Sequence, residues 1–205
     1  MPEIGILAYG SLIKDRGAEL ESLVVEERDV VTPFNVEFAR SSRTRGGAPT
    51  LIPVTGGGAP VSARVLVLRE GTSKEEAEDV LWRRETSRVG SSEGYRHPVA
   101  PGANAVVIRS LKNVAGFATV LYTEIASNID PLTVERLADL AIQSARRPAG
   151  GHRRDGISYL IDAKRVGIMT PLTPEYEREI LRRMGASSLE GAYERARAEE
   201  SRDSV

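Results

Sequence analysis

The chain has 205 residues, of which 40% are hydrophobic and 28% charged, with a formal net charge of −1 and no cysteine. This usage is ordinary for a globular protein and argues against a disordered or fibrous chain. The near-zero net charge predicts no general attraction to nucleic acid or to an anionic membrane. Without cysteine there can be no disulfide, thiolate nucleophile or zinc–thiolate site.

No signal for membrane insertion or secretion is visible. No apolar stretch approaches the length of about 18 residues that marks a membrane-spanning helix. The N-terminus also lacks the basic segment and long apolar segment of a secretory signal. We therefore expect a cytoplasmic protein with no membrane partner.

The first element is an apolar run, Ile4 to Ala8, which stops at the small, flexible turn Tyr9-Gly10-Ser11-Leu12. An apolar run bounded by glycine is typical of a buried strand. A Gly-Ser turn lets backbone N–H groups approach a ligand, and two or three N–H groups aimed in one direction form an anion-binding nest. The same residues also suit a simple exit from strand to loop, and both interpretations stay open at this point.

Further segments have the alternation or the short apolar runs of β-strands. Most of them follow one another without an intervening helix, which favours antiparallel pairing in a meander or a partial barrel. Residues 14–27 predict only a loop and a short helix. The expected strands cover residues 34–38, 50–54, 63–68, 94–99, 103–108 and 116–122.

The first clear helix is predicted to begin at Ser73. Ser73 and Glu76 have the spacing of a capping box, and apolar residues then recur at helical intervals. Arg84 and Glu85 lie seven and eight residues beyond Ala77, so they fall on or beside the face that packs inward. Because a charged pair on that face needs polar partners, either the helix ends before the pair or at least one side chain is held in a polar pocket.

Most of the chain after residue 130 has the pattern of helices. Asp130 followed by Pro131 is a favourable helix start, because Asp caps the first turn and Pro fits the first helical position. A second capping box, Ser187 with Glu190, indicates the start of the last helix. The remaining helices are expected over residues 156–167 and 173–184.

The last residues, 195–205, are charged and nearly free of large apolar side chains, so we expect a frayed tail. Nothing in the preceding chain looks like a linker between domains. We therefore expect a single domain over residues 1–194.

Several common functional signatures are absent. Gly56 to Gly58 is not followed by Gly-Lys-Ser/Thr and does not open a helix, so no phosphate-binding P-loop is expected, and there is no Rossmann fingerprint. The two histidines, His97 and His152, have no His or Cys neighbours at ligand spacing, so no metal is expected. Ser11 lacks the glycines of a nucleophile elbow, which leaves an acyl hydrolase based on Ser11 and a histidine as a minor alternative.

Two arginine-rich segments, residues 40–47 and 146–154, could meet phosphate groups or could be solvated loops. Nucleic-acid binders usually combine such charge with stacking aromatic side chains. Aromatic residues make up only 5% of this chain. We therefore expect no nucleic-acid partner.

Three short motifs occur in a recognisable order. They are Ala8-Tyr9-Gly10-Ser11-Leu12 after the first strand, Trp82-Arg83-Arg84-Glu85 at the end of a helix, and Glu93-Gly94-Tyr95 at the start of the next expected strand. This order resembles the gamma-glutamylcyclotransferase family, and its ChaC-like branch in particular. Asp155-Gly156-Ile157-Ser158-Tyr159-Leu160 is also similar to a Gly-Ile-x-Tyr-Leu segment of that branch. The chain departs from the family in the spacer from Thr86 to Glu93, which is longer than the family's spacer.

The resemblance implies an α+β fold, namely a small mixed, mainly antiparallel β-barrel with surrounding helices and a helical C-terminal segment. It implies a reaction without a cofactor, in which the α-amine of a γ-glutamyl group attacks its own γ-carbonyl. The products are 5-oxoproline and an amine or peptide. The expected partner is therefore a small γ-glutamyl compound.

The resemblance also implies roles for individual residues. The backbone N–H groups of Gly10, Ser11 and Leu12 would hold the substrate α-carboxylate. Glu85 would take a proton from the α-ammonium and later pass it to the leaving nitrogen, as general base and then general acid. The other expected substrate-binding residues are the matched tyrosines Tyr9, Tyr95 and Tyr159.

Plainer interpretations of the same residues stay open. Glu85 could be a surface carboxylate paired with Arg84 or Arg88, because Glu is usually exposed. Each tyrosine could be a packed aromatic whose hydroxyl has a hydrogen-bond partner. In that case the chain could be a non-catalytic module of the same fold that binds a small carboxylate ligand.

Overall fold

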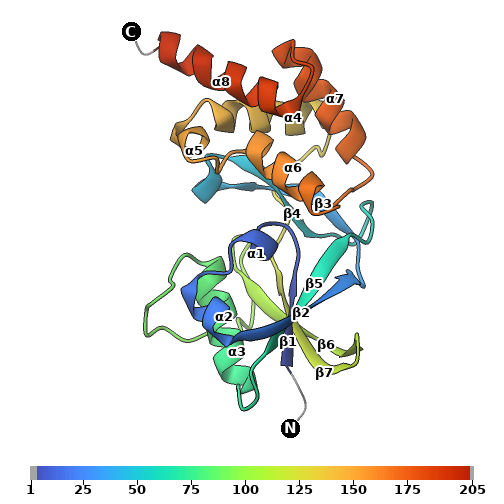
Figure 1. Cartoon of the computed structure of the whole chain (residues 1–205), viewed down its shortest axis with the longest axis vertical. Coiled ribbons are helices and arrows are strands. Elements are labelled where there is room, and N and C mark those ends of the chain that lie inside the picture. The colour runs from blue at the N-terminus through green and yellow to red at the C-terminus, as the bar shows by residue number, and fades with distance from the viewer. Residues whose placement is uncertain (1–3, 204–205) are drawn as a thin grey trace. The chain divides into compact units, whose positions relative to one another are not determined.

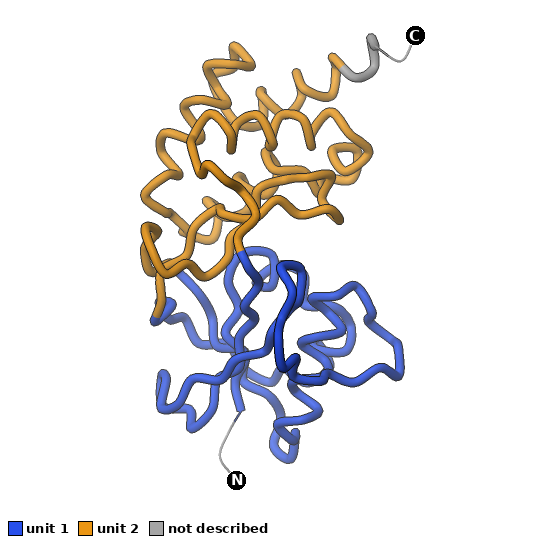
Figure 2. Tube along the Cα trace, turned by 180° about the vertical axis from the view of Figure 1, so that it is seen from behind, with its two compact units in different colours: residues 1–33, 62–126 blue, residues 34–61, 127–205 orange. Residues whose placement is uncertain are grey.

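The computed structural model describes the backbone of residues 4–203 and the side chains of residues 4–199. The chain divides into two compact units, which Figure 2 shows in different colours. Unit 1 consists of residues 1–33 and 62–126, and unit 2 consists of residues 34–61 and 127–205. Each unit is thus built from two separate stretches of chain. The single domain expected over residues 1–194 stays a prediction.

Unit 1 is organised around a five-stranded sheet with the strand order β2-β5-β1-β7-β6. β1 is antiparallel to β5 and parallel to β7, and the other neighbours are antiparallel. The central strand therefore places residues 4–8 in the middle of the core, where Ile6 and Ala8 have no exposed surface. The strands are β1 (Ile4–Ala8), β2 (Val24–Val31), β5 (Ser62–Leu68), β6 (Val107–Val114) and β7 (Phe117–Glu124).

The sheet is mainly antiparallel, as expected, but the described strands do not close into a barrel. β2 and β6 are the two edge strands of an open sheet. Much of β2 is exposed and charged, from Glu26 to Asp29. Charged side chains on an edge strand oppose pairing with a further strand. The β-barrel that the resemblance implies is therefore not a closed one in the described strands.

The described residues of unit 1 form three helices, namely α1 (Ser11–Lys14), α2 (Ala18–Leu23) and α3 (Lys74–Glu85). The capping prediction for α3 is confirmed, because the Ser73 hydroxyl accepts a hydrogen bond of 3.0 Å from the N–H of Glu76. α3 buries Ala77, Val80 and Leu81 and contacts β1, β6 and β7. This packing fixes the helix that carries Arg84 and Glu85.

The strand expected over residues 94–99 is not formed. The chain from residue 92 to residue 98 is irregular, and β6 begins at Val107, four residues later than expected. The N–H of Tyr95 donates to Oδ1 of Asp79, at 2.6 Å, and Pro98 has no N–H to offer to a neighbouring strand. The backbone of this segment is thus held by a helix side chain and not by a sheet.

Unit 2 combines a two-stranded antiparallel sheet with helices (Figure 1). α4 and α6 contact β4, α7 contacts α4 and α8, and α8 also contacts α4 and α6. The strands are β3 (Val36–Ser42) and β4 (Ala48–Pro53), joined by the 3-10 turn η1 (Arg43–Arg45). The helices are α4 (Val134–Ala145), α5 (Pro148–Gly151), α6 (Gly156–Arg165), α7 (Thr173–Met184) and α8 (Leu189–Asp203).

Two helix starts in unit 2 differ from the expected ones. Asp130 does not cap α4; Thr133 does so, with its hydroxyl accepting from the N–H of Arg136 at 3.2 Å. α8 begins one residue later than expected, since the hydroxyl of Ser188 and not of Ser187 accepts from Gly191 N–H. α8 also continues through Asp203, over most of the expected frayed tail, and residues 204–205 lie outside the described part. Among the described residues, no helix has the length and apolar character needed to cross a membrane.

The interior of unit 2 contains a tyrosine hydroxyl with no hydrogen-bond partner among the described residues. Tyr176 is fully buried, its ring lies 5.4 Å from that of Phe38, and its hydroxyl is unbonded. Burial, together with the nearby charge of Asp155, raises the pKa of Tyr176. A buried hydroxyl without a partner costs about 1–3 kcal/mol of desolvation. It therefore opposes folding and does not support it.

We expect Tyr176→Phe to leave the free energy of unfolding unchanged or to raise it by about 1 kcal/mol, because the ring contacts stay and only the hydroxyl is lost. The matched control is Tyr193→Phe, since the Tyr193 hydroxyl is buried but donates to the carbonyl of Gly150 at 2.8 Å. That variant should lose about 1 kcal/mol. Urea unfolding followed by circular dichroism measures both, and equal losses in the two variants would contradict the prediction.

Candidate active site

The turn after β1 is shaped by a glycine. Gly10 has φ +58° and ψ −130°, a backbone conformation that is essentially restricted to glycine. The chain then forms the single helical turn α1, in which the N–H of Asp15 donates to the carbonyl of Ser11 at 2.9 Å. Within residues 4–203 the N–H groups of Gly10, Ser11 and Leu12 have no hydrogen-bond acceptor. The turn therefore offers the N–H groups that an anion-binding nest requires.

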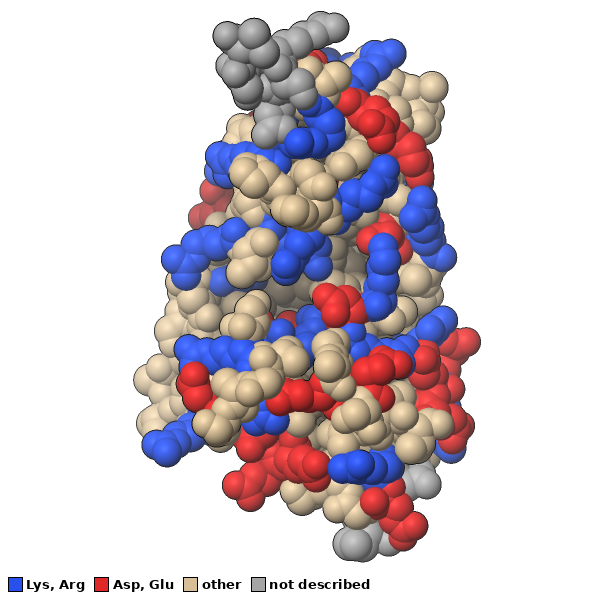
Figure 3. All heavy atoms as spheres, turned by 60° about the vertical axis from the view of Figure 1, so that its left-hand side comes forward, with Lys and Arg blue, Asp and Glu red and all other residues tan. Residues whose placement is uncertain are grey.

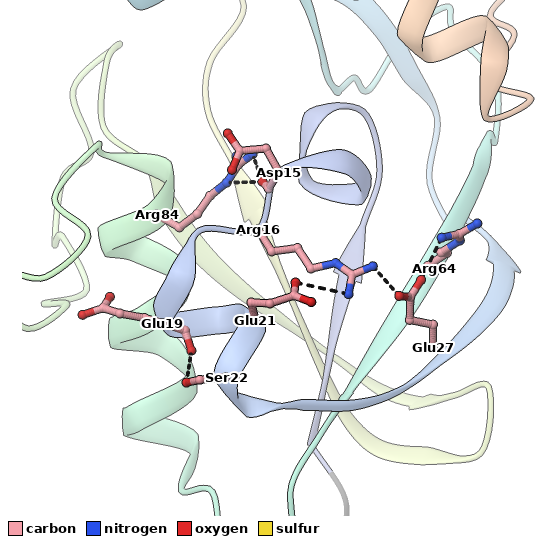
Figure 4. Close-up of polar contacts among 8 residues, drawn as sticks. All are labelled: Asp15, Arg16, Glu19, Glu21, Ser22, Glu27, Arg64 and Arg84. Carbon is pink, nitrogen blue, oxygen red and sulfur yellow. Dashed lines mark hydrogen bonds and ion pairs between the residues drawn. The ribbon is translucent and has the colours of Figure 1, made fainter.

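Arg84, at the C-terminal end of α3, joins this turn to Glu85. Its guanidinium donates to the hydroxyl of Ser11 at 3.3 Å and to Oε1 of Glu85 at 2.7 Å. It also donates to the carbonyl of Asp15 at 3.0 Å, a contact that Figure 4 shows. The Arg84 side chain is 11% exposed and that of Glu85 is 23% exposed. α3 thus includes both residues, and of the two possibilities left open for this pair, the polar pocket is the one observed.

The segment after α1 is held in place by a second ion-pair network. Arg16, next to Asp15, contacts Glu21 and Glu27, and Arg64 on β5 contacts the same Glu27 at 2.7 Å (Figure 4). These contacts tie the segment to β2 and β5. The carbonyl that receives Arg84 is therefore attached to the main sheet of unit 1.

The spacer that departs from the family pattern is anchored by Arg83 and Glu19. Arg83 donates to a carboxylate oxygen of Glu19 at 3.0 Å and to the carbonyl of Glu93 at 3.0 Å. The other oxygen of Glu19 accepts from the N–H of Gly90 at 3.1 Å. Neighbouring arginines on α3 thus have separate tasks, since Arg83 holds the spacer and Arg84 holds the turn and Glu85.

Tyr9 and Tyr95 also belong to unit 1. The Tyr9 hydroxyl donates to the carbonyl of Thr123 on β7 at 3.4 Å. The Tyr95 hydroxyl accepts from the N–H of Ile108 at 3.0 Å and lies 3.0 Å from Nδ1 of His97. The direction of the Tyr95–His97 hydrogen bond depends on the tautomer of His97, because the hydroxyl that accepts from Ile108 can either donate to Nδ1 or accept a second hydrogen bond from it.

Tyr95 lines an open groove with a volume of about 460 Å³. Its walls come from α3 and β6, and Glu78 on its α3 wall precedes Glu85 by seven residues. Seven residues are two helical turns, so the two carboxylates share one side of α3 and are about 10 Å apart along its axis. The residues that line the groove are Lys74, Glu78, Tyr95, His97, Ile108, Arg109 and Ser110.

Tyr159, the remaining matched tyrosine, belongs to unit 2. It is 6% exposed, its ring lies 6.2 Å from that of Phe38, and the guanidinium of Arg45 lies over its face at 4.9 Å. The cluster described above contains only residues of unit 1. The substrate-binding role implied for Tyr159 stays a prediction.

No family model and no curated protein matches this chain. The resemblance to the gamma-glutamylcyclotransferases therefore depends on the short motifs and their order. Among the described residues there is also no group of three or more His, Asp or Glu side chains placed to hold a metal ion.

Sequence reasoning did not anticipate the role of Arg84 as a bridge. The available signal was its place beside the inward face of α3, which the helical spacing from Ala77 indicates. That spacing shows that Arg84 needs a polar partner, but it cannot name Ser11 and Asp15, which precede it by 73 and 69 residues. Only the packing of α3 against the sheet brings these groups together.

Proposed function

We propose that the chain is a gamma-glutamylcyclotransferase-type enzyme that releases 5-oxoproline from a γ-glutamyl amide or peptide. The observation that carries this proposal is the Arg84 guanidinium, which links the hydroxyl of Ser11 to the carboxylate of Glu85. The motif for carboxylate binding and the motif for proton transfer, far apart in the sequence, thereby become one cluster in unit 1. The reaction requires that proximity.

The substrate α-carboxylate would bind to the N–H groups of Gly10, Ser11 and Leu12, with Arg84 as the neighbouring cation. An intramolecular ring closure gains several kcal/mol when the flexible chain is held folded back on itself. Anchoring the α-carboxylate at the turn would hold the adjacent α-nitrogen near Glu85. The Arg84 bond occupies Oε1 of Glu85, which leaves Oε2 for the α-ammonium.

Proton transfer by Glu85 balances the reaction. Glu85 accepts a proton from the α-ammonium, and the free amine attacks the γ-carbon to form the ring C–N bond. The negative charge on the γ-oxygen needs hydrogen-bond donors, and the Tyr9 hydroxyl would supply one by exchanging its long bond of 3.4 Å to the Thr123 carbonyl for a bond to the γ-oxygen. When the original γ-amide C–N bond breaks, that proton passes from Glu85 to the leaving nitrogen. The ring nitrogen still carries two hydrogens after the attack, and it gives the second as a proton to the freed Glu85 carboxylate, which passes it to the amine that leaves as an ammonium.

The groove beside Tyr95 would receive the group attached to the γ-nitrogen. It lies on the same side of α3 as Glu85 and is lined by side chains of both charges. Lys74 and Glu78 form an ion pair of 2.9 Å there. A polar or zwitterionic leaving group would suit this lining better than an apolar one.

The direct test is to incubate the full chain with glutathione, γ-glutamyl dipeptides and γ-glutamyl amines and to measure 5-oxoproline. We expect release from at least one class, without an added cofactor. If γ-glutamyl compounds raise the melting temperature but no 5-oxoproline forms, the chain is a binding module of the same fold. If γ-glutamyl compounds neither raise the melting temperature nor release 5-oxoproline, the proposal that the chain binds a γ-glutamyl ligand is refuted.

A further inference from the structure

Unit 2 joins the two arginine-rich segments of the sequence, residues 40–47 and 146–154. Nη1 of Arg147 donates to the carbonyl of Gly46 at 2.8 Å. A Cβ atom on Gly46 would lie 3.0 Å from Cβ of Ala149, and Gly46 and Gly47 have φ values of +67° and +91°. The glycines thus allow the turn Arg43–Gly47, called here the arginine turn, to lie directly against the start of α5. As a result, the Arg147 side chain contacts the backbone of a residue some 100 positions earlier in the sequence.

The joined segments carry seven arginines and no Asp or Glu. Arg146 and Arg153 form ion pairs with carboxylates on α8, namely Glu199 and Glu194. Arg43 and Arg147 form no ion pair with any carboxylate in the described part of unit 2. Figure 3 shows one face of the molecule, on which Lys and Arg side chains lie among Asp and Glu side chains. Arg43 and Arg147 therefore bring positive charge to the joined segments with no matching carboxylate in the described part of unit 2.

Asp155, the carboxylate nearest in the sequence to the two arginine-rich segments, forms its hydrogen bonds with the backbone of α6. Asp155 follows the second segment directly, but it is fully buried, and its Oδ1 accepts from the N–H groups of Ile157 and Ser158 at the start of α6. It therefore serves as a helix cap. Within the first segment, burial and the charge of Arg43 lower the pKa of Arg40, which shows that these two cations repel each other. A bound anion would relieve that repulsion.

The aromatic residues near the arginine turn favour a compact anion over a nucleic acid. Tyr159 and Tyr193 are 6% and 7% exposed. Each already has an arginine over its face, Arg45 at 4.9 Å and Arg153 at 4.3 Å. Single-stranded nucleic acids bind largely by stacking bases on accessible aromatic rings. Neither ring is accessible for that purpose.

We propose that the arginine turn and Arg147 bind the phosphate or diphosphate group of a small molecule. Guanidinium groups match phosphate oxygens with paired hydrogen bonds, and these charge-assisted bonds are among the strongest in proteins. This site is separate from the Arg84–Glu85 cluster and does not rest on the proposed cyclotransferase activity. Its ligand is defined by the multiply charged phosphate group alone.

The test is a calorimetric titration of the full chain with inorganic pyrophosphate at constant ionic strength. We expect saturable binding, and we expect Arg43→Gln/Arg147→Gln to weaken it about tenfold or more, since two charge-assisted contacts are lost. Arg43→Gln alone, which removes no hydrogen bond of the described fold, should weaken binding by a smaller factor. The matched control is Arg182→Gln on α7, which also removes one exposed arginine and should change the dissociation constant less than about twofold.

Three results would overturn the proposal. They are no binding of pyrophosphate, equal binding by wild type and the double variant, or equal weakening by Arg182→Gln, which would indicate general charge attraction. In a second arm, a single-stranded oligonucleotide replaces pyrophosphate. If it binds much more tightly than pyrophosphate through the same arginines, the site recognises nucleic acid, and the small-molecule proposal fails.

Discussion

Glu85→Gln is expected to lower 5-oxoproline release by about 10²- to 10⁴-fold, the usual contribution of a general acid–base group. The substitution keeps the size and shape of the side chain. Its amide oxygen can still accept the hydrogen bond from Arg84 that Oε1 accepts at 2.7 Å. The fold should therefore persist, while the group that takes the ammonium proton is lost. The effect should fall on kcat more than on KM, because the carboxylate anchor at Gly10 to Leu12 is unchanged.

The matched control for this prediction is Glu75→Gln. Glu75 lies in the first turn of the same helix and is exposed, and it takes no part in the Arg84 cluster. It should retain the activity of the wild type. A Glu85→Gln protein that melts like the wild type and turns over at full rate would refute the proposed role of Glu85. A loss of activity in both variants would instead point to a general effect of charge on α3.

The elements that were predicted correctly are those whose signal is local. β1 is a short apolar run bounded by glycine, and α3 combines a capping serine with apolar residues at helical spacing. The same spacing placed Arg84 and Glu85 beside the inward face, and both are largely buried, at 11% and 23% exposure. Periodicity alone therefore showed that this pair needs polar partners, because the face of a helix is fixed by residue number.

The features that were missed depend on contacts between distant parts of the chain. The segment from residue 94 has the alternation of a strand, but Asp79 takes the N–H of Tyr95, and no described strand pairs with the segment through backbone hydrogen bonds. The division into two units, each made of two stretches of chain, is not accompanied by a change in composition or a linker-like segment that the sequence would reveal. Likewise, the meeting of Arg147 with Gly46 is set by tertiary packing. Local pattern cannot report on partners that lie many residues away.

The packing of α5 against the end of α4 can be tested by a glycine in α5. A Cβ atom on Gly150 would lie 1.9 Å from the carbonyl oxygen and 2.7 Å from the carbonyl carbon of Ala145, at the end of α4. Both atoms are backbone, so they cannot move aside as the end of a flexible side chain could. Gly150→Ala should therefore destabilise unit 2 by about 3 kcal/mol, at the upper end of the usual cost of overpacking. The carbonyl of Gly150 also accepts the hydrogen bond of Tyr193, which ties α8 to the same point.

The adjacent glycine provides the control, because Gly151 belongs to the same short helix but has open space. Its nearest neighbour is Nη2 of Arg197, at 3.5 Å, the end of a flexible side chain. Gly151→Ala should be neutral or should stabilise the protein by up to about 1 kcal/mol, since alanine is the better helix former. In urea unfolding, far-ultraviolet circular dichroism follows mainly the helices of unit 2, and the fluorescence of Trp82, the single tryptophan, follows unit 1. The loss in Gly150→Ala should appear in the dichroism, and equal midpoints for the two variants would show that the end of α4 does not approach residue 150 as described.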